Sequence, residues 1–460
     1  MALSRTDRWL ILALVLLNVA LKCAWLDTTG LAHDEPFTVY WSQRPWGALW
    51  SMFATENNPP LYFLLIKLWS WVTPFTAGWL RVPSALFSAL AVWPLFLLGH
   101  RLGGRVAGVC AALLFTFSNY HYGFAHEVRA YALFTLLVTT GMWLLWRAKD
   151  KPNNGLRAML GLSALNTLLI YTHFFGWLAI GLQGLCLFAL PELRHLRRNF
   201  LFGCWITLAW FSPYLVIFWK RLGTSVTHGT WLEAPVPEEL YNMLWRWSNA
   251  PVVTVVFLIV IAVAGARDRL RAPGLRLAVF WSFVPLLGMF LVSFAVPMFL
   301  DRYLVYAAPG FALLVAMAAT HLTIPRRWAS GLAAVLVIGM AITFTPWRSG
   351  VRDPSRVVKT VDDWCKEDCE VEIVPRWYWL NYLAAEDLEQ LKDDQSDLLQ
   401  SDIVIPDRAS AALIGPIVVV DASGDRMIGD RDRYRSLKAV YPSIDSVEAD
   451  HKVWVYRFRF

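Results

Sequence analysis

Long apolar runs separated by short polar connections recur through most of this 460-residue chain. Each run has roughly 15–20 residues, a length that as a helix matches the hydrocarbon thickness of a bilayer. Eleven such runs occur, at residues 9–26, 79–99, 106–119, 131–146, 158–171, 174–190, 200–219, 251–266, 277–296, 303–322 and 328–345. Charged residues make up only 17% of the chain, against about a quarter in soluble proteins. These features exclude a soluble globule, a disordered chain and a disulfide-dense secreted scaffold, and they predict a polytopic α-helical membrane protein.

The basic residues indicate how the chain is oriented in the membrane. Residues 346–460 contain 16 Lys and Arg against 22 Asp and Glu, so the net charge of +7 arises from the hydrophobic part. With the amino terminus, alternate connections carry 17 of the 26 basic residues of that part, as the positive-inside rule requires of cytoplasmic segments. This alternation predicts a cytoplasmic amino terminus, an outer carboxyl terminus, and a further apolar run, 59–72, that lies on the outer surface without crossing. No basic domain or basic–aromatic groove indicates nucleic-acid binding.

The chain changes character after Pro346. Short β-prone runs there alternate with charged, helix-compatible stretches such as Ala384–Leu399. The β-prone runs are Val371–Val374, Asp402–Ile405, Pro416–Val420 and Val453–Phe458. We therefore expect a transmembrane domain over 1–345 and a small α/β domain outside the membrane over 346–460.

Two cysteines of this tail, Cys365 and Cys369, are spaced as C-K-E-D-C. In a cytosolic domain they would be free thiols or half of a metal site. Because the charge pattern places the tail outside the cytoplasm, a local disulfide is the favoured interpretation.

Two acidic residues follow the first apolar run, in the sequence L-A-H-D-E-P-F. Asp34 and Glu35 in an otherwise apolar outer loop can supply a general base and a metal or hydrogen-bond partner; the alternative is a solvated helix amino terminus. The outer loop between the third and fourth runs adds Glu127 and Arg129, together with two histidines. Glu127 and Arg129 could neutralise each other, but charge at the membrane edge is costly and by default marks a site. We predict one site shared by the two loops.

Later outer loops add further polar side chains to this face. His173 stands in Y-T-H-F-F-G and Arg302 in L-D-R-Y-L. The planar donor fork of an arginine suits a phosphate, although a salt bridge with the adjacent Asp301 is the alternative. A lone histidine such as His173 is more often a satisfied interface residue than a ligand. Glu35, Tyr131 and Tyr303 complete the candidate substrate-binding set.

Six short motifs, in order along residues 30–310, resemble those of the membrane-embedded GT-C glycosyltransferases. The likeness is greatest to bacterial members of glycosyltransferase family 39, near the protein O-mannosyltransferases and the lipid A aminoarabinose transferase. The motifs are H-D-E-P-F, N-P-P-L-Y-F-L-L-I-K-L-W, L-R-V-P-S-A-L-F, H-E-V-R-A-Y-A-L, Y-T-H-F-F-G and R-Y-L-V-Y-A-A-P. The tail resembles the family only in being an outer α/β appendage.

The resemblance implies a glycosyltransferase (EC 2.4) of the bacterial inner membrane. It would transfer a single sugar from a polyprenyl-phosphate carrier to a glycan, lipid or protein acceptor on the outer side. In that family the first acid of the Asp-Glu pair lies at the catalytic centre, which here is Asp34, and the acid of the second outer loop matches Glu127. A basic or His residue often precedes the Pro pair, where this chain has Asn57 and Asn58. Other cations are then the candidates for the donor phosphate: Lys67, Arg129 and Arg302.

The chemistry of such a transfer is compatible with these residues. A sugar on a lipid phosphate needs no nucleotide, so the missing phosphate-binding glycine loop is no objection. A single displacement inverts the anomeric carbon and needs a base for the acceptor hydroxyl, for which we expect Asp34, and cations for the departing phosphate. A divalent metal ion between Asp34, Glu127 and the phosphate stays an open alternative. The rival functions are a lipid-linked-sugar flippase, for which the repeated halves typical of transporters are missing, and a ligase using a diphosphate-linked oligosaccharide.

Overall fold

The computed structural model describes residues 3–28, 31, 34–55, 58–150, 155–228, 234–266, 272–322, 325–346, 354–365, 369–374, 416–422, 431–450 and 453–460. The chain divides by its internal contacts into two units. The first unit comprises Met1–Ala24, Gly47–Leu65 and Arg81–Pro346, and the second comprises Trp25–Trp46, Ile66–Leu80 and Trp347–Phe460.

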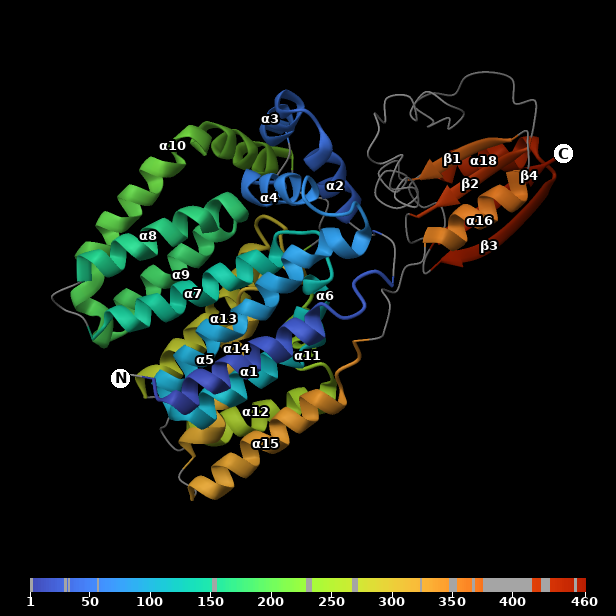
Figure 1. Cartoon of the computed structure of the whole chain (residues 1–460). Coiled ribbons are helices and arrows are strands. Elements are labelled where there is room, and N and C mark those ends of the chain that lie inside the picture. Colours follow the sequence, from blue (N-terminus) through green and yellow to red (C-terminus); the bar gives the residue numbers. More distant parts are fainter. Residues whose placement is uncertain are drawn as a thin grey trace. The chain divides into compact units, whose positions relative to one another are not determined.

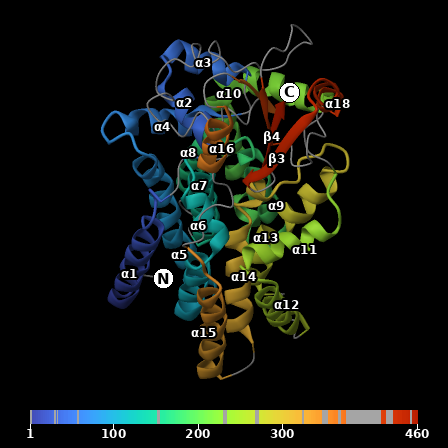
Figure 2. The ribbon, with the colours of Figure 1, turned by 90° about the vertical axis from the view of Figure 1, so that its right-hand side faces the viewer.

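All eleven apolar runs form helices. The long helices of the first unit lie along one another (Figures 1 and 2). They are α1 (Arg5–Lys22), α5 (Ala77–Thr116), α7 (Tyr131–Ala148), α8 (Gly155–Thr172), α9 (Gly176–Ala189), α10 (Arg197–His228), α12 (Pro251–Ala266), α13 (Pro273–Val292), α14 (Ala308–His321) and α15 (Arg326–Ile342). Shorter helices connect or precede them: α2 (Glu35–Gln43), α3 (Trp46–Thr55), α4 (Pro60–Ser70), α6 (Asn119–Ala125), η2 (Pro191–Leu196), α11 (Glu238–Trp247) and η4 (Asp301–Leu304).

Helix α5 contains two of the predicted runs, because the chain turns back on itself within it. Gly104 has φ 80° and ψ −174°, a conformation outside the helical region that glycine adopts without steric cost. A Cβ on Gly99 would lie 2.9 Å from the Cα of Gly108. In an uninterrupted helix these two residues would be about 13 Å apart along the axis, so the two halves must pack as a hairpin. Glycine at both positions permits the close approach.

Several helices meet membrane-span criteria. In the described part of the chain three are individually long and apolar enough to cross a bilayer: α5, the stretch Pro191–Trp219 and α13. Helices α11 and α12, bent by 94° at their junction, form a fourth candidate. The polytopic helical class is thus confirmed, while the number of eleven spans stays a prediction. Helix α4 has 11 residues and a length of about 16 Å, and the interfacial position of 59–72 stays a prediction.

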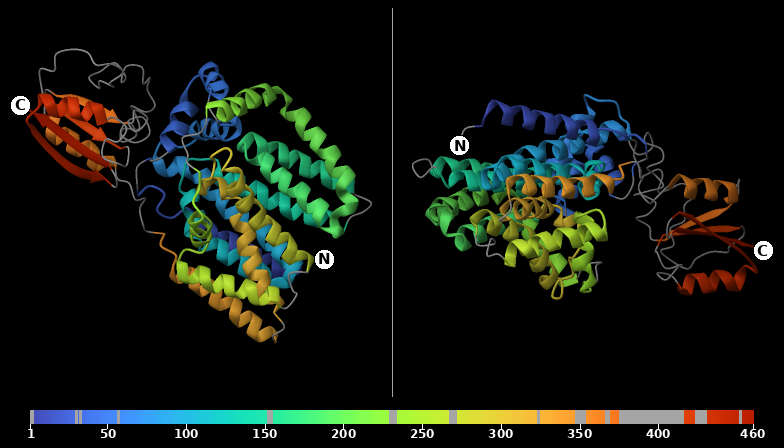
Figure 3. Two further views of the ribbon diagram at one scale, coloured as in Figure 1. Left: turned by 180° about the vertical axis from the view of Figure 1, so that it is seen from behind. Right: turned by 90° about the horizontal axis from the view of Figure 1, so that it is seen from below.

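Helix α14 forms the core of one side of the bundle. It packs against α12, α13 and α15, and almost all residues from Ala308 to Ala319 are buried. Helix α1 lies on one side of the bundle and α12 on the other (Figures 2 and 3). Polar pairs also join the helices inside the bundle, such as Asn166 of α8 with Gln183 of α9, whose amides exchange hydrogen bonds of 2.9 and 3.0 Å.

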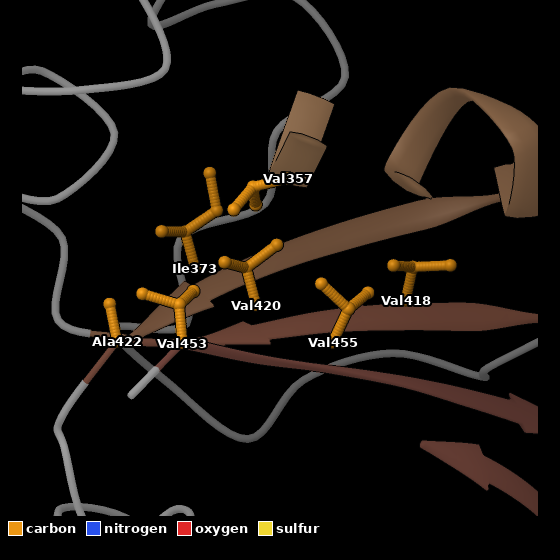
Figure 4. Close-up of a cluster of buried hydrophobic side chains, with 7 residues drawn as sticks. All are labelled: Val357, Ile373, Val418, Val420, Ala422, Val453 and Val455. Carbon is orange, nitrogen blue, oxygen red and sulfur yellow. The ribbon is translucent and has the colours of Figure 1, made fainter. Parts of the chain in front are cut away.

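The tail forms the expected small α/β domain. Its sheet has the order β1 (Glu370–Val374), β2 (Ile417–Asp421), β4 (Val453–Arg459), β3 (Ser443–Asp450), with β1 and β2 parallel and the other pairs antiparallel. Helix α16 (Pro354–Cys365) packs on one face of the sheet, where valines and isoleucine form the core (Figure 4): Val357, Ile373, Val418, Val420, Ala422, Val453 and Val455. Helix α18 (Arg431–Val440) covers the other face, where Leu437 and Tyr441 pack on alternate strand residues.

Three of the four predicted β-prone runs are strands, and the fourth, Asp402–Ile405, lies outside the described residues, as does the stretch 384–399. Strand β3 was not predicted, because its sequence S-I-D-S-V-E-A-D is mostly polar and the strand lies at the sheet edge with only its last residue buried. Cys365 and Cys369 form the predicted disulfide, with a Cα–Cα distance of 5.2 Å that is normal for such bridges.

Candidate active site

The predicted acidic pair stands at the amino end of helix α2 in the second unit. Asp34 is the residue that caps the helix, with φ −97° and ψ 3°, but its side chain makes no capping hydrogen bond. Glu35 is the first helical residue and is only 3% exposed. The positive end of a helix dipole favours carboxylates at this place. Successive helical residues point about 100° apart, so the two carboxylates address different surroundings.

Lys67 of α4 lies at the opposite end of α2. Its ammonium donates to the backbone oxygens of Ser42 at 3.2 Å and Arg44 at 2.8 Å. It also lies over the rings of Trp46 at 5.2 Å and Trp71 at 5.9 Å. Burial, with a smaller effect of the neighbouring Arg44, lowers the pKa of Lys67. The structure thus gives this predicted phosphate ligand a set of partners in the chain itself.

Other bonds join the same two stretches of the second unit. The carboxylate of Asp27 accepts from the backbone N–H of Gly78 at 2.9 Å, and a Cβ on Gly78 would lie 2.9 Å from the Cβ of Asp27. The Gln43 amide donates to the Ser70 hydroxyl at 3.1 Å. These bonds join the segment that carries Asp34 to the segment that carries Lys67.

In the first unit, His173 lies at the centre of an aromatic cluster. Its ring stacks on Phe134 at a centroid distance of 5.0 Å and contacts Phe175 at 5.2 Å, Tyr131 at 5.9 Å and Tyr303 at 6.0 Å. Its Nδ1 accepts from the backbone N–H of Phe175 at 3.1 Å. In the neutral ring the proton must then be on Nε2, which becomes a hydrogen-bond donor.

Two arginines act on this histidine. Burial, and then the positive charges of Arg129 and Arg302, lower the pKa of His173 to about 3, so the imidazole is neutral at physiological pH. Arg129 also donates to the side-chain oxygen of Asn58 at 3.3 Å and lies over the Tyr131 ring at 5.8 Å. The first unit therefore brings together the basic and aromatic residues that the sequence proposed from three separate outer loops.

Asp301, the alternative partner of Arg302, has other partners as well. The Asp301 carboxylate forms an ion pair with Arg246 of α11, and one of its oxygens accepts from the backbone N–H of Arg302 at 2.7 Å. The Tyr120 hydroxyl donates to the Asp301 backbone oxygen. These bonds tie η4 to α11 and α6 and so fix the segment that carries Arg302.

Glu127 lies in the turn between α6 and α7 of the first unit, where its backbone oxygen accepts from the Arg129 N–H at 2.8 Å. This local bond fixes the two residues relative to each other through the main chain. In the same loop His121 is buried and His126 is half-buried. Burial and the charge of Lys22 keep the pKa of His121 well below its usual range and lower that of His126 to about 4. Neither histidine is protonated at neutral pH.

In the described ranges no three His, Cys, Asp or Glu side chains approach closely enough to hold a metal ion. Two basic residues at the ends of apolar runs were not among the candidates predicted from the sequence. Arg81 of α5 is 3% exposed, and the fully buried Lys22 of α1 lies over the Tyr122 ring at 5.2 Å. A basic residue at the end of an apolar run was the signal that could have identified both.

The family model for the protein O-mannosyl-transferase TMEM260 N-terminal domain matches residues 58–196, less than half of the chain. Curated protein sequences give no match. The residues that match the family model include the second and third motifs, the loop of Glu127 and Arg129, and His173.

Solved structures share the architecture of the whole chain. ArnT from Cupriavidus metallidurans in the apo state has a TM-score of 0.63 at 15% identity, over 99% of this chain and 98% of that one. This is the GT-C glycosyltransferase fold. ArnT bound to undecaprenyl phosphate gives 0.62 at 14% identity, over 97% of each chain. The archaeal oligosaccharyltransferase AglB from Archaeoglobus fulgidus, in complex with an inhibitory peptide and a dolichol-phosphate, gives 0.53 at 10% identity over 90% of this chain and 70% of that one. The GT-C resemblance inferred from the motifs is therefore confirmed at the level of the fold.

Proposed function

We propose that this protein transfers a single sugar from a polyprenyl-phosphate carrier to an acceptor on the outer face of the membrane. The observation that carries the proposal is the aromatic cluster around His173, whose ring contacts Tyr131 and Tyr303: Arg129 lies over the Tyr131 ring, and Arg302 precedes Tyr303 in the chain. Two unit charges near a rigid aromatic surface, at the membrane edge, suit a sugar attached to a phosphate better than they suit a structural role. The ArnT and AglB structures, which share the fold, contain lipid phosphates.

The two arginines bind the donor phosphate in this proposal. Arg129 is supported in this role by its contact with Asn58, the residue immediately before the Pro pair, where related motifs often have a basic residue. The Arg129 guanidinium thus supplies positive charge beside the Pro pair, where this sequence has Asn58 in place of a basic residue. Planar forks stabilise the departing phosphate through two parallel N–H bonds. Tyr131, Tyr303 and the neutral His173 offer ring faces and donors to the sugar.

Asp34 is the base. The acceptor hydroxyl oxygen attacks the anomeric carbon while Asp34 takes the hydroxyl proton. The bond from that carbon to the phosphate oxygen breaks, its electron pair leaves with the polyprenyl phosphate, and the carbon is inverted. Glu127 orients the attacking hydroxyl, and Glu35, buried beside Asp34 in sequence, stabilises the loop that presents it. The alternation of basic residues between the connections, together with the fold, supports a multi-pass protein of the bacterial inner membrane with the α/β tail outside. Glycans, lipids and proteins are all candidate acceptors.

The experiment is a lipid analysis of a strain that lacks the protein. We expect a polyprenyl-phosphate sugar to accumulate in its membrane extract and to disappear when the wild-type protein is restored. The Asp34→Asn protein should be inserted at normal level and leave the accumulation in place. An extract identical to that of the parent strain would contradict the proposal. Accumulation on one membrane leaflet only, with no transfer by the purified protein, would indicate the flippase.

A further inference from the structure

Helix α2 depends on support from outside itself. It has only 9 residues, and helices shorter than about 12 residues are marginal in water without tertiary contacts. The last carbonyls of any helix lack partners within it and attract cations. Lys67, 5% exposed, supplies this partner, because its ammonium donates to the oxygens of Ser42 and Arg44 at the carboxyl end of α2.

The same helix presents the acidic pair at its other end. Hydrogen bonds run back along it: the Ser42 hydroxyl donates to the Thr38 oxygen at 2.6 Å, and the Thr38 hydroxyl donates to the Asp34 oxygen at 3.3 Å. A displacement at Ser42 therefore passes through a continuous, short and hydrogen-bonded element to Asp34. The length of α2, about 13 Å, is the distance over which Lys67 acts.

We propose that Lys67 is a positioning residue that fixes the carboxyl end of α2 and thereby sets the place of Asp34. The inference rests on the proposed function, in which Asp34 is the base, and it replaces the expected role of Lys67 as a ligand of the donor phosphate. Two carbonyl oxygens and the rings of Trp46 and Trp71 already surround the ammonium. Its lowered pKa agrees with a dry, internally paired position.

The first test measures α2 itself by amide hydrogen exchange of the full-length protein in detergent or nanodiscs. Lys67→Met keeps the aliphatic stem and removes the donors. We expect the amides of residues 38–43 to exchange at least tenfold faster in this variant and to recover most of their protection in Lys67→Arg. The matched control is Lys149→Met, which removes another lysine over a tryptophan ring, that of Trp146 at 4.9 Å, and should leave α2 unchanged. Unchanged exchange in Lys67→Met would overturn the proposal.

The second test measures transfer with the polyprenyl-phosphate lipid fraction that accumulates in the deletion strain. A displacement of about 1 Å at a catalytic group costs on the order of 100-fold in rate, so Lys67→Met should lower kcat by about 10- to 100-fold while donor KM stays within about threefold. In the Asp34→Asn background the same substitution should have almost no further effect, because both act through one group. A rise in donor KM with unchanged kcat would make Lys67 a phosphate ligand.

The two measurements separate the two hypotheses. If the wild-type protein catalyses no transfer, the proposed function fails, and the hydrogen-exchange result still decides whether Lys67 fixes α2. If transfer is normal in Lys67→Met while α2 exchanges faster, the positioning role is wrong although the proposed function stands.

Discussion

Replacing Asp34 by Asn is the most direct test of the proposed chemistry, because the structure allows its effect on stability to be separated from its effect on rate. Asp34 caps α2 without a side-chain capping bond, and Asn is as good a capping residue as Asp. The only capping energy at risk is the attraction of the carboxylate to the helix dipole, about 0.3–1 kcal/mol. The loss of this attraction alone should leave the protein folded.

The expected effect on rate is much larger. General base catalysis contributes about 100- to 10,000-fold, equivalent to about 2.7–5.5 kcal/mol of transition-state stabilisation. Asp34→Asn keeps the shape of the side chain and removes the proton acceptor, so kcat should fall by at least about 100-fold. Binding of the carrier lipid should persist. The assay is single-turnover transfer from the radiolabelled carrier lipid, with lipid binding and thermal unfolding measured on the same preparation.

A matched control is available in the same loop. Asp27→Asn changes the same chemical group, but the carboxylate of Asp27 serves to accept the Gly78 N–H at 2.9 Å, a bond that an amide oxygen can also accept. This variant should transfer at nearly the wild-type rate. Near-normal transfer in Asp34→Asn with an inactive Glu35→Gln would move the base to Glu35. Normal transfer in both would remove this loop from the chemistry.

Three further predictions follow from the charges and the side chains. Alkaline phosphatase fused after residue 350 should be active and fused after residue 150 inactive, and the reverse pair would refute the topology. Alkylation of unreduced protein should label neither Cys365 nor Cys369, and ready labelling of either would contradict the bridge seen in the structure. Arg302→Lys should weaken use of the donor, seen as a higher donor KM, because a point charge does not reproduce a two-pronged contact; unchanged donor KM in both Arg302→Lys and Arg302→Ala would make this arginine structural.

The sequence by itself predicted most of the secondary structure of the membrane part. Apolar length and charge alternation are local properties, and in a bilayer every backbone polar group must be bonded within its own segment, so each apolar run became a helix. Sequence also separated 79–99 from 106–119, because the polar, glycine-containing connection between them breaks the run, and Gly104 indeed leaves the helical conformation. The polar edge strand β3 lacked such a local signal and was missed.

The partners of the charged residues were decided by the tertiary structure. Sequence named Arg302 and Lys67 as candidates and gave a salt bridge between Arg302 and Asp301 as an alternative, but it gave no sign that the Asp301 carboxylate forms an ion pair with Arg246, 55 residues away. The ammonium of Lys67 reaches carbonyl oxygens 23 and 25 residues earlier in the chain. The sequence determined which side chains are too polar to face lipid, because the cost of burying an unpaired charge depends on residue type. The packing of elements distant in the chain determined which partner each of them meets, because a hydrogen bond or ion pair forms only where two groups come within a few ångströms of each other.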